Sequence, residues 1–256
     1  MKKVLLGTVA VITVIMAAPA LAADLPAQTY TAKAPAMFEP PHDWSGSYIG
    51  ANVGGGSNRS CWDLANVGGT TVIPSVSEGC HDARGGLAGA QIGYRWQSAN
   101  WVFGMEAQGD WANLTGSGLS STAVFTNAVT NATKSNALGL FAGQVGYSWN
   151  NFLGYVKGGA AVTRENYSGS LTGFNLTLDQ SSETRWGGSI GAGLEIGFAP
   201  DWSLGLEYDH LFMGNRNITF PVTALVSSRT DNIHQDVDIG TVRVNYRFGG
   251  PVVAKY

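Results

Sequence analysis

Apolar side chains alternate with small or polar ones in eight separate stretches of roughly ten residues each. A strand that crosses a bilayer at a tilt needs roughly 9–11 residues, with one face toward lipid and the other toward a lumen. The connectors between these stretches are alternately long and very short. The pattern therefore predicts an all-β fold, an eight-stranded antiparallel transmembrane β-barrel of the outer-membrane type.

The predicted strands are 44–55, 86–96, 101–111, 137–149, 152–164, 185–198, 202–212 and 238–248. Three connectors are very short (97–100, 150–151 and 199–201), and four are long and rich in Ser, Thr, Asn and Gly (56–85, 112–136, 165–184 and 213–237). In outer-membrane barrels the short turns face the periplasm and the long loops face outside. We expect four exposed loops here.

The first residues predict export. Lys2 and Lys3 precede an apolar run over 4–17, and small residues then lead to a predicted cleavage after Ala22. A spanning helix is the alternative, but it requires about 20 apolar residues. We therefore expect a signal peptide at 1–22, a Pro-rich periplasmic segment at 23–43 and the barrel at 44–256, in the bacterial outer membrane.

The alternation also predicts what faces the lumen. In the last strand Val242, Val244 and Phe248 share one face, and Arg243 and Arg247 share the other. The apolar face is expected to contact lipid, because Arg or Lys at the bilayer midplane costs about 2–4 kcal/mol. The same parity turns nine charged residues inward: Arg95, Glu106, Asp110, Lys157, Glu195, Glu207, Asp209, Arg243 and Arg247.

The lumen of an eight-stranded barrel is only wide enough for side chains to fill it. Charges in so narrow a space must be paired or hydrated. The nearly balanced signs predict an ion-pair network that plugs the lumen, and a gated or narrow conduit is the alternative. Inward glycines (Gly89, Gly104, Gly191 and Gly205) would leave room for long Arg side chains.

Aromatic residues gather at the predicted strand ends, as amphipathic rings do at a membrane interface. We expect a periplasmic girdle of Trp44, Trp96, Trp101, Trp149, Phe152, Phe198 and Trp202. We expect an outer girdle of Trp111, Tyr167, Trp186 and Phe212.

Charged residues are 13% of the chain, below the typical ~25%, and the formal net charge is −3. This excludes the clustered basic surface that nucleic-acid binding needs. Cys61 and Cys80 are an even pair in an exported chain, which predicts a disulfide. Two free thiols, or zinc held by both cysteines and His81, are the alternatives.

No catalytic motif is present: there is no His-Glu-x-x-His, phosphate-binding glycine loop or Gly-x-Ser-x-Gly elbow. We predict no enzymatic activity, no metal site and no cofactor. His81, His210 and His234 should lie toward the outer surface, where imidazoles could ligate haem iron or simply be solvated. A lipid-modifying hydrolase would need a serine near His210.

Two segments resemble a known family. They are Trp44-Ser-Gly-Ser-Tyr-Ile-Gly-Ala-Asn-Val-Gly-Gly-Gly56 and Val242-Arg-Val-Asn-Tyr-Arg-Phe-Gly-Gly-Pro-Val-Val-Ala-Lys-Tyr256. They are similar to the alpha-proteobacterial, porin-like family of small outer-membrane immunogenic β-barrel proteins. The resemblance implies insertion by the outer-membrane barrel assembly machinery, which reads an aromatic-ended last strand, here Tyr246, Phe248 and Tyr256. Members are abundant surface proteins, often described as porins and some as haem-binding.

The sequence thus predicts a non-enzymatic surface barrel that contributes to envelope integrity. A narrow porin-like diffusion channel, or a haem or adhesin receptor, is the alternative. The expected partners are outer-membrane lipid, lipopolysaccharide and the assembly machinery. A host or haem ligand at the loops belongs to the receptor alternative.

Overall fold

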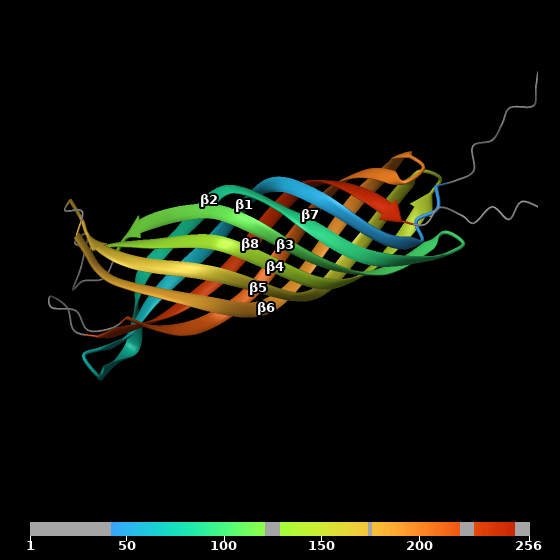
Figure 1. Ribbon diagram of the computed structural model, residues 1–256. Helices are drawn as coiled ribbons and strands as arrows, with labels where there is room; N and C mark the ends of the chain where they lie inside the picture. The colour runs from blue at the N-terminus through green and yellow to red at the C-terminus, as the bar shows by residue number, and fades with distance from the viewer. Residues whose placement is uncertain (1–41, 121–128, 174–175, 221–227, 249–256) are drawn as a thin grey trace, which may run out of the picture. The chain divides into compact units, whose positions relative to one another are not determined.

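The structure is a computed structural model that describes residues 42–120, 129–173, 176–220 and 228–248. Eight antiparallel strands pair in chain order, and β1 pairs with β8 to close a barrel (Figure 1), which confirms the predicted fold class. The strands are β1 (Gly46–Val67), β2 (Thr70–Ser98), β3 (Trp101–Leu119), β4 (Val129–Trp149), β5 (Phe152–Leu171), β6 (Leu176–Ala199), β7 (Trp202–Phe220) and β8 (Arg229–Phe248). The predicted signal peptide at 1–22 lies outside the described residues, as does nearly all of the 23–43 segment.

The three very short connectors are confirmed as two-residue turns, at 99–100, 150–151 and 200–201. Two of them begin with a residue in the left-handed region, Ala99 (φ 52°) and Asn150 (φ 54°), as tight hairpin turns require. None of the described residues forms a helix long and apolar enough to cross a membrane.

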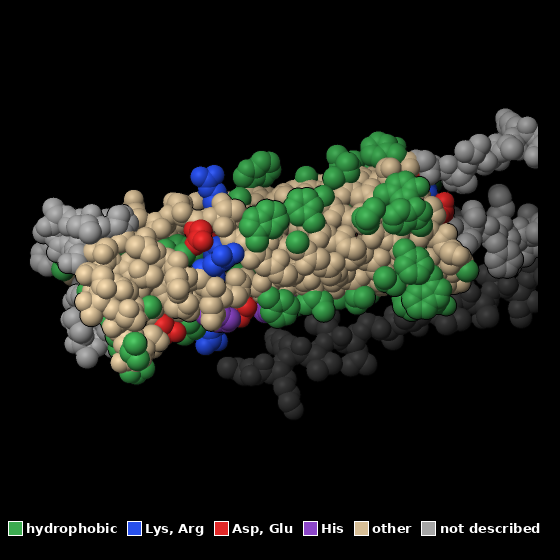
Figure 2. All heavy atoms as spheres, turned by 90° about the horizontal axis from the view of Figure 1, so that it is seen from below, with side chains coloured by type: hydrophobic (Ala, Val, Ile, Leu, Met, Phe, Trp, Pro, Cys, Tyr) green, Lys and Arg blue, Asp and Glu red, His purple; other side chains and the backbone are tan. Residues whose placement is uncertain are grey.

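A band of apolar side chains covers the outside of the barrel near the short turns. Trp101, Phe198 and Trp202 are 52%, 61% and 44% exposed at the turn end, and Trp111 is 78% exposed ten residues along β3. On the face drawn in Figure 2, hydrophobic side chains (green) gather over the part of the barrel near the short turns and are fewer beyond it. We call this outward surface, between the rows of Trp101 and Trp111, the lipid-facing band.

The strands are much longer than predicted, with lengths of 19 to 29 residues. Most of each predicted long connector is strand: 56–67 and 70–85 pair with each other, for example, around a turn at Gly68 and Gly69. The prediction of four long loops was therefore wrong in extent. Beyond the lipid-facing band the outward side chains meet water, so the apolar alternation that identified the strands disappears although the hydrogen-bonded ladders continue.

Beyond the band the barrel divides into two sheets. The ladder between β2 and β3 ends at Arg84↔Thr115, and that between β6 and β7 ends at Gly188↔Phe212, while the other six ladders continue outward. Figure 1 shows β3–β6 separating from β1, β2, β7 and β8 at the end opposite the short turns. We call this region the outer sandwich. One sheet contains 57–67, 70–83, 213–220 and 229–237, and the other contains 116–119, 129–135, 165–171 and 176–187.

Candidate functional site: the barrel lumen

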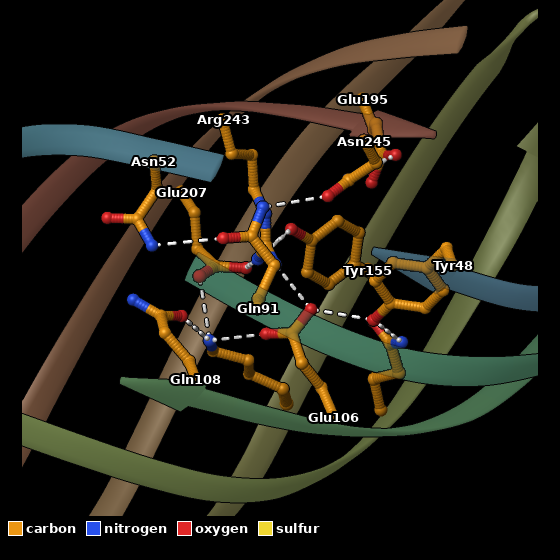
Figure 3. Close-up of polar contacts among 12 residues, drawn as sticks. Tyr48, Asn52, Gln91, Glu106, Gln108, Tyr155, Glu195, Glu207, Arg243 and Asn245 are labelled. Carbon is orange, nitrogen blue, oxygen red and sulfur yellow. Dashed lines mark hydrogen bonds and ion pairs between the residues drawn. The ribbon is translucent and has the colours of Figure 1, made fainter. Parts of the chain in front are cut away.

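All nine charged residues predicted to face inward are buried, with at most 8% of each residue exposed. At the centre of the lumen, two cations meet three carboxylates. Lys157 Nζ on β5 lies 2.7 Å from Glu207, 3.3 Å from Glu106 and 3.3 Å from Asp209. Arg243 on β8 pairs with both Glu106 on β3 and Glu207 on β7 (Figure 3). Four strands spread around the barrel are thus joined by ion pairs across its interior.

Two tyrosines complete this central cluster. The Tyr48 hydroxyl donates to Glu106 Oε2 at 2.6 Å, and the Tyr155 hydroxyl donates to Glu207 Oε2 at 2.5 Å. Each ring lies against an inward glycine, Gly93 beneath Tyr48 and Gly193 beneath Tyr155, where a Cβ would collide with the ring. Glycine at these positions lets the rings approach the neighbouring strand.

The inward glycines named from sequence accommodate different side chains than predicted. Gly205 does lie against Arg243. Gly89 and Gly191 instead lie against Asp110 and Asp209, and Gly104 lies against Gln144. The room that they leave is used mainly by carboxylate and amide groups.

A second group lies closer to the short turns. Arg95 Nη2 is 2.8 Å from Glu195 Oε2, and Glu195 also accepts hydrogen bonds from Asn245 and Ser203. The Arg95 guanidinium faces the Trp44 ring, with 5.8 Å to its centroid. Trp44 is only 2% exposed, so its predicted place in the lipid-facing girdle was wrong. It closes the turn end of the lumen because it packs inward with Val102 and Leu153.

The remaining two predicted charges lie apart from these groups. Arg247 reaches the mouth of the barrel at the short turns, 3.2 Å from Asp43 and 3.3 Å from Asp201, and does not pair with a lumen carboxylate among the described residues. Asp110 accepts a 2.9 Å hydrogen bond from Gln108. The structure therefore divides the nine charges between a central cluster, a second cluster and two outlying positions.

The lumen narrows to packed side chains on both sides of the central cluster. A cavity of about 10 Å³ beside Arg95, Glu195 and Arg247 offers room for about one water molecule. On the outer side the lumen is filled by an apolar layer of Ala83, Leu87, Leu114, Leu138, Leu140, Ala161, Leu211, Met213, Val237 and Ile239. Charged and apolar layers therefore succeed each other along the interior.

Sequence reasoning missed the filled interior of the outer sandwich. Trp62, Tyr167, Ile218, Phe220 and Ile233 form an aromatic and aliphatic core between the two sheets. Tyr167 is 1% exposed, so its predicted place in the outer girdle was wrong. An available signal was the spacing of two residues between Ile218 and Phe220, in a segment read as loop.

Polar side chains bridge the two sheets around that core. Glu165 on β5 accepts hydrogen bonds from Ser135 at 2.7 Å and from Gln235 on β8 at 2.9 Å. Glu78 on β2 accepts a 2.8 Å hydrogen bond from Asn131 on β4. These contacts hold the sheets together where the backbone ladders are missing.

Two side chains lie directly at the open seams. At the β6/β7 seam, Arg185 donates to the carbonyl oxygens of Gly214 at 2.7 Å and Ile233 at 3.1 Å. At the β2/β3 seam, the His81 ring crosses over Gly118 and its Nε2 lies 3.0 Å from Thr133 Oγ1 on β4. Each of these two side chains makes a contact across a seam where the backbone ladder is missing.

The contact between His81 and Thr133 across the β2/β3 seam should weaken as the pH falls. Burial lowers the pKa of the His81 imidazole below its ordinary value of 6.5, although Asp82 acts in the opposite direction. Below 6.5 the unfolded chain binds a proton that the folded protein resists, so this contribution to stability is lost as the pH falls toward the lower folded pKa. We expect faster amide hydrogen exchange at 78–83, after correction for intrinsic rates, when the pH is lowered from about 7.5 to about 5.5.

The matched control for this experiment is His81→Gln, which keeps a hydrogen-bonding group beside Thr133 but has no proton to gain. The exchange at 78–83 should then change little with pH. An equal pH response in both proteins would assign the effect to another group.

The predicted disulfide is present: Cys61 and Cys80 are bonded and lie directly opposite each other on β1 and β2. Within 70–83 the only strand that β2 pairs with in the described structure is β1, so the bond secures an edge that lacks a second neighbour. Closure of the 19-residue separation stabilises by about 3 kcal/mol in the chain-entropy model.

We expect reduction of this disulfide to accelerate proteolytic cleavage within 70–83, measured by mass spectrometry, while the heat resistance of the membrane part changes little. Unchanged cleavage in the reduced protein would contradict this role.

The three histidines do not converge on one point. His81 points between the sheets, whereas His210 and His234 lie on the outside of β7 and β8. His210 Nδ1 is 2.7 Å from Asp238, and His234 Nε2 is 3.2 Å from Asp236. Among the described residues, no three His, Cys, Asp or Glu side chains are arranged to hold a metal ion.

The predicted insertion signal is described in part. Tyr246 and Phe248 point outward at the end of β8, with ring centroids 5.0 Å apart. Tyr246 also packs against Trp202 of β7, at 5.0 Å. Tyr256 lies outside the described residues.

Comparisons with known proteins agree with this architecture. Residues 8–248 match the family model described as "Outer membrane protein beta-barrel domain". The 31 kDa outer-membrane immunogenic protein of Brucella melitensis is 30% identical, over 97% of this chain and 100% of the relative. The 25 kDa outer-membrane immunogenic protein of Brucella abortus is 28% identical, over 90% and 92%. The crystal structure of OprG from Pseudomonas aeruginosa covers 82% of this chain and 99% of its own, with a TM-score of 0.55 and 11% identity, and shows the same fold.

Proposed function

This chain belongs to the outer membrane protein β-barrel domain family, and from that premise we propose that it is a closed, non-enzymatic surface barrel. It lies in the bacterial outer membrane, where the short turns face the periplasm and the outer sandwich faces outside. Its role is to contribute to envelope integrity and to present the outer sandwich at the cell surface. The relatives' names describe surface antigens, which supports such a role.

The observation that carries this proposal is the contact of Arg243 with Glu106 and Glu207 across the lumen. A channel needs a continuous hydrated path, but here ion pairs span the interior and an apolar layer follows on the outer side. Buried charges that satisfy one another hold the strands in register rather than offering sites to a passing ion. The narrow diffusion channel is therefore the less favoured alternative.

The direct test is the ionic conductance of the full chain, refolded and inserted into a planar bilayer. Heat-modifiable gel mobility shows beforehand that the barrel is folded. We expect no discrete conductance steps from folded protein. Reproducible steps that scale with salt concentration would replace this proposal with the diffusion channel.

The receptor alternative has a separate test. If His81 and His234 bound haem iron, replacing both should abolish hemin binding measured by absorbance. The two imidazoles lie on opposite faces of their strands, so we expect any hemin binding to persist in the double variant. Loss of binding in that variant would favour a haem receptor.

The assembly machinery is proposed to read Tyr246, Phe248 and Tyr256 at the end of the chain.

A further inference from the structure

Two cations lie on the outer wall of β4 and β5, where the lipid-facing band ends. Trp111 is in register with Ala137, which is in register with Arg164, so Arg164 lies in the row of the outer girdle. Lys134 pairs with Asn166, two residues farther out on the same strand as Arg164. A rise of roughly 3.3 Å per residue places the two cations within about 7 Å of each other along the strand direction. Girdle aromatics mark the depth of lipid headgroups, so both cations lie at or just beyond the headgroups.

No ion pair neutralises either of these cations in the part of the chain that the structure describes. Lys134 and Arg164 are exposed, and neither forms an ion pair within the described ranges. The side chains that point outward on the described parts of β3–β6 include no Asp or Glu. On the other four strands, by contrast, Arg84 of β2, in register with Thr115, pairs with Asp82 at 2.9 Å, and His210 of β7 pairs with Asp238. The β3–β6 wall is therefore the cationic side of the barrel.

A polar groove of about 700 Å³ adjoins the two cations on this wall. Its outward lining consists of hydroxyl and amide side chains with one ammonium: Thr115, Ser117, Lys134, Asn166, Gln180 and Ser182. Ser182 already donates a 2.8 Å hydrogen bond to Asn166 across β5 and β6. Hydroxyl and amide groups both donate and accept hydrogen bonds, which is the chemistry that recognises sugar hydroxyls.

We propose that this wall is a binding site for lipopolysaccharide, with phosphate groups on Arg164 and Lys134 and the first sugars in the adjoining groove. The occupant follows from three features found together: cations at headgroup depth, a sugar-sized polar groove directly beyond them, and a surface facing the outer leaflet. A phospholipid would satisfy the cations but would leave the groove empty. The site depends on the barrel's location and not on whether the lumen conducts.

The test measures the affinity of the detergent-refolded full chain for purified lipopolysaccharide. The variant Lys134→Gln/Arg164→Gln removes both charges, and Arg59→Gln/Arg216→Gln removes two exposed cations of β1 and β7 as the matched control. Each surface cation near an anionic headgroup contributes on the order of a few-fold in affinity, so the site variant should bind roughly tenfold to thirtyfold more weakly. The control variant should stay close to the wild type. Equal weakening of both variants, or of neither, would overturn the proposal.

Further probes distinguish the possible sources of the phosphate. Dephosphorylated lipopolysaccharide should bind the wild type as weakly as intact lipopolysaccharide binds the site variant. Vesicles of phosphatidylglycerol and inorganic phosphate should favour the wild type over the site variant by much less than lipopolysaccharide does, because neither probe fills the groove. A preference as large as that for lipopolysaccharide would point to a general anion site.

The groove is tested separately. Ser182→Trp fills it with a large ring on an exposed position, and heat-modifiable mobility checks that the barrel still folds. We expect weaker binding of lipopolysaccharide that carries its core sugars and unchanged binding of lipid A alone. Equal binding of both ligands by this variant and by the wild type would remove the sugar part of the proposal.

Discussion

Replacing Arg243 with Ala is expected to lower the free energy of unfolding by about 3–5 kcal/mol, the cost of removing one partner from a buried ion pair. The guanidinium is 1% exposed and joins Glu106 to Glu207. Without it, Lys157 alone faces these two carboxylates and Asp209. Urea unfolding of the refolded protein, followed by tryptophan fluorescence and heat-modifiable mobility, measures the loss. No new ion conductance should accompany it, because the apolar layer still closes the lumen.

Arg247→Ala is the matched control, since it removes the same side chain from the same face of β8. Arg247 pairs with Asp43 and Asp201, whose side chains are 42% and 35% exposed. Such partly exposed pairs contribute about 0–1 kcal/mol. Similar losses in the free energy of unfolding for Arg243→Ala and Arg247→Ala would contradict the assignment of Arg243 to the central cluster and of Arg247 to an outlying position. An open conductance in Arg243→Ala would show that the ion pairs alone close the lumen.

A second variant separates charge from packing at this position. Replacing Arg243 with Met while changing Glu106 and Glu207 to Gln removes the unpaired charges and keeps most of the volume. Buried ion pairs can often be exchanged for neutral groups of similar size at little cost. We therefore expect this triple variant to be markedly more stable than Arg243→Ala.

The membrane part of the fold was predictable because lipid imposes one strict rule on every strand. Outward positions such as Val242, Val244 and Leu206 must be apolar, so the period of two is visible directly in the sequence. The same rule fixes the inward parity, and all nine lumen charges lie on the predicted face. Which charge meets which depends on strand register and side-chain reach, which alternation does not encode. Arg243 and Arg247 look equivalent in sequence yet lie in different surroundings.

The outer sandwich was not predictable by that rule because the rule reverses outside the membrane. On β8 the apolar positions are even-numbered from Val242 to Phe248 and face outward, whereas Ile239, Val237 and Ile233 are odd-numbered and face inward. On β7 the same change separates Leu206 from Ile218. Once water replaces lipid, the interior becomes the only place to bury apolar area. The inversion itself therefore marks where a strand leaves the bilayer.

Removing the Trp62 ring tests whether this outer region is a packed structure. Trp62 is fully buried, lies 5.7 Å from Tyr167 and 5.8 Å from Phe220 between ring centroids, and faces the Arg229 guanidinium at 5.7 Å. Trp→Ala in a core costs about 3–5 kcal/mol through lost contacts and the cavity left behind. We expect Trp62→Ala to open the outer sandwich locally, so that limited proteolysis and amide exchange increase in both sheets.

The control for this prediction is Trp111→Ala, which removes an equal ring that is 78% exposed on the lipid-facing side. It should leave exchange in the outer sandwich unchanged. Heat resistance of the membrane part should survive in Trp62→Ala, because the central ion pairs lie below the apolar layer and do not contact Trp62. Loss of the whole fold in that variant would mean that sandwich and barrel unfold as one unit. Protease resistance equal to that of the wild type would mean that the two sheets do not depend on the buried core for their cohesion.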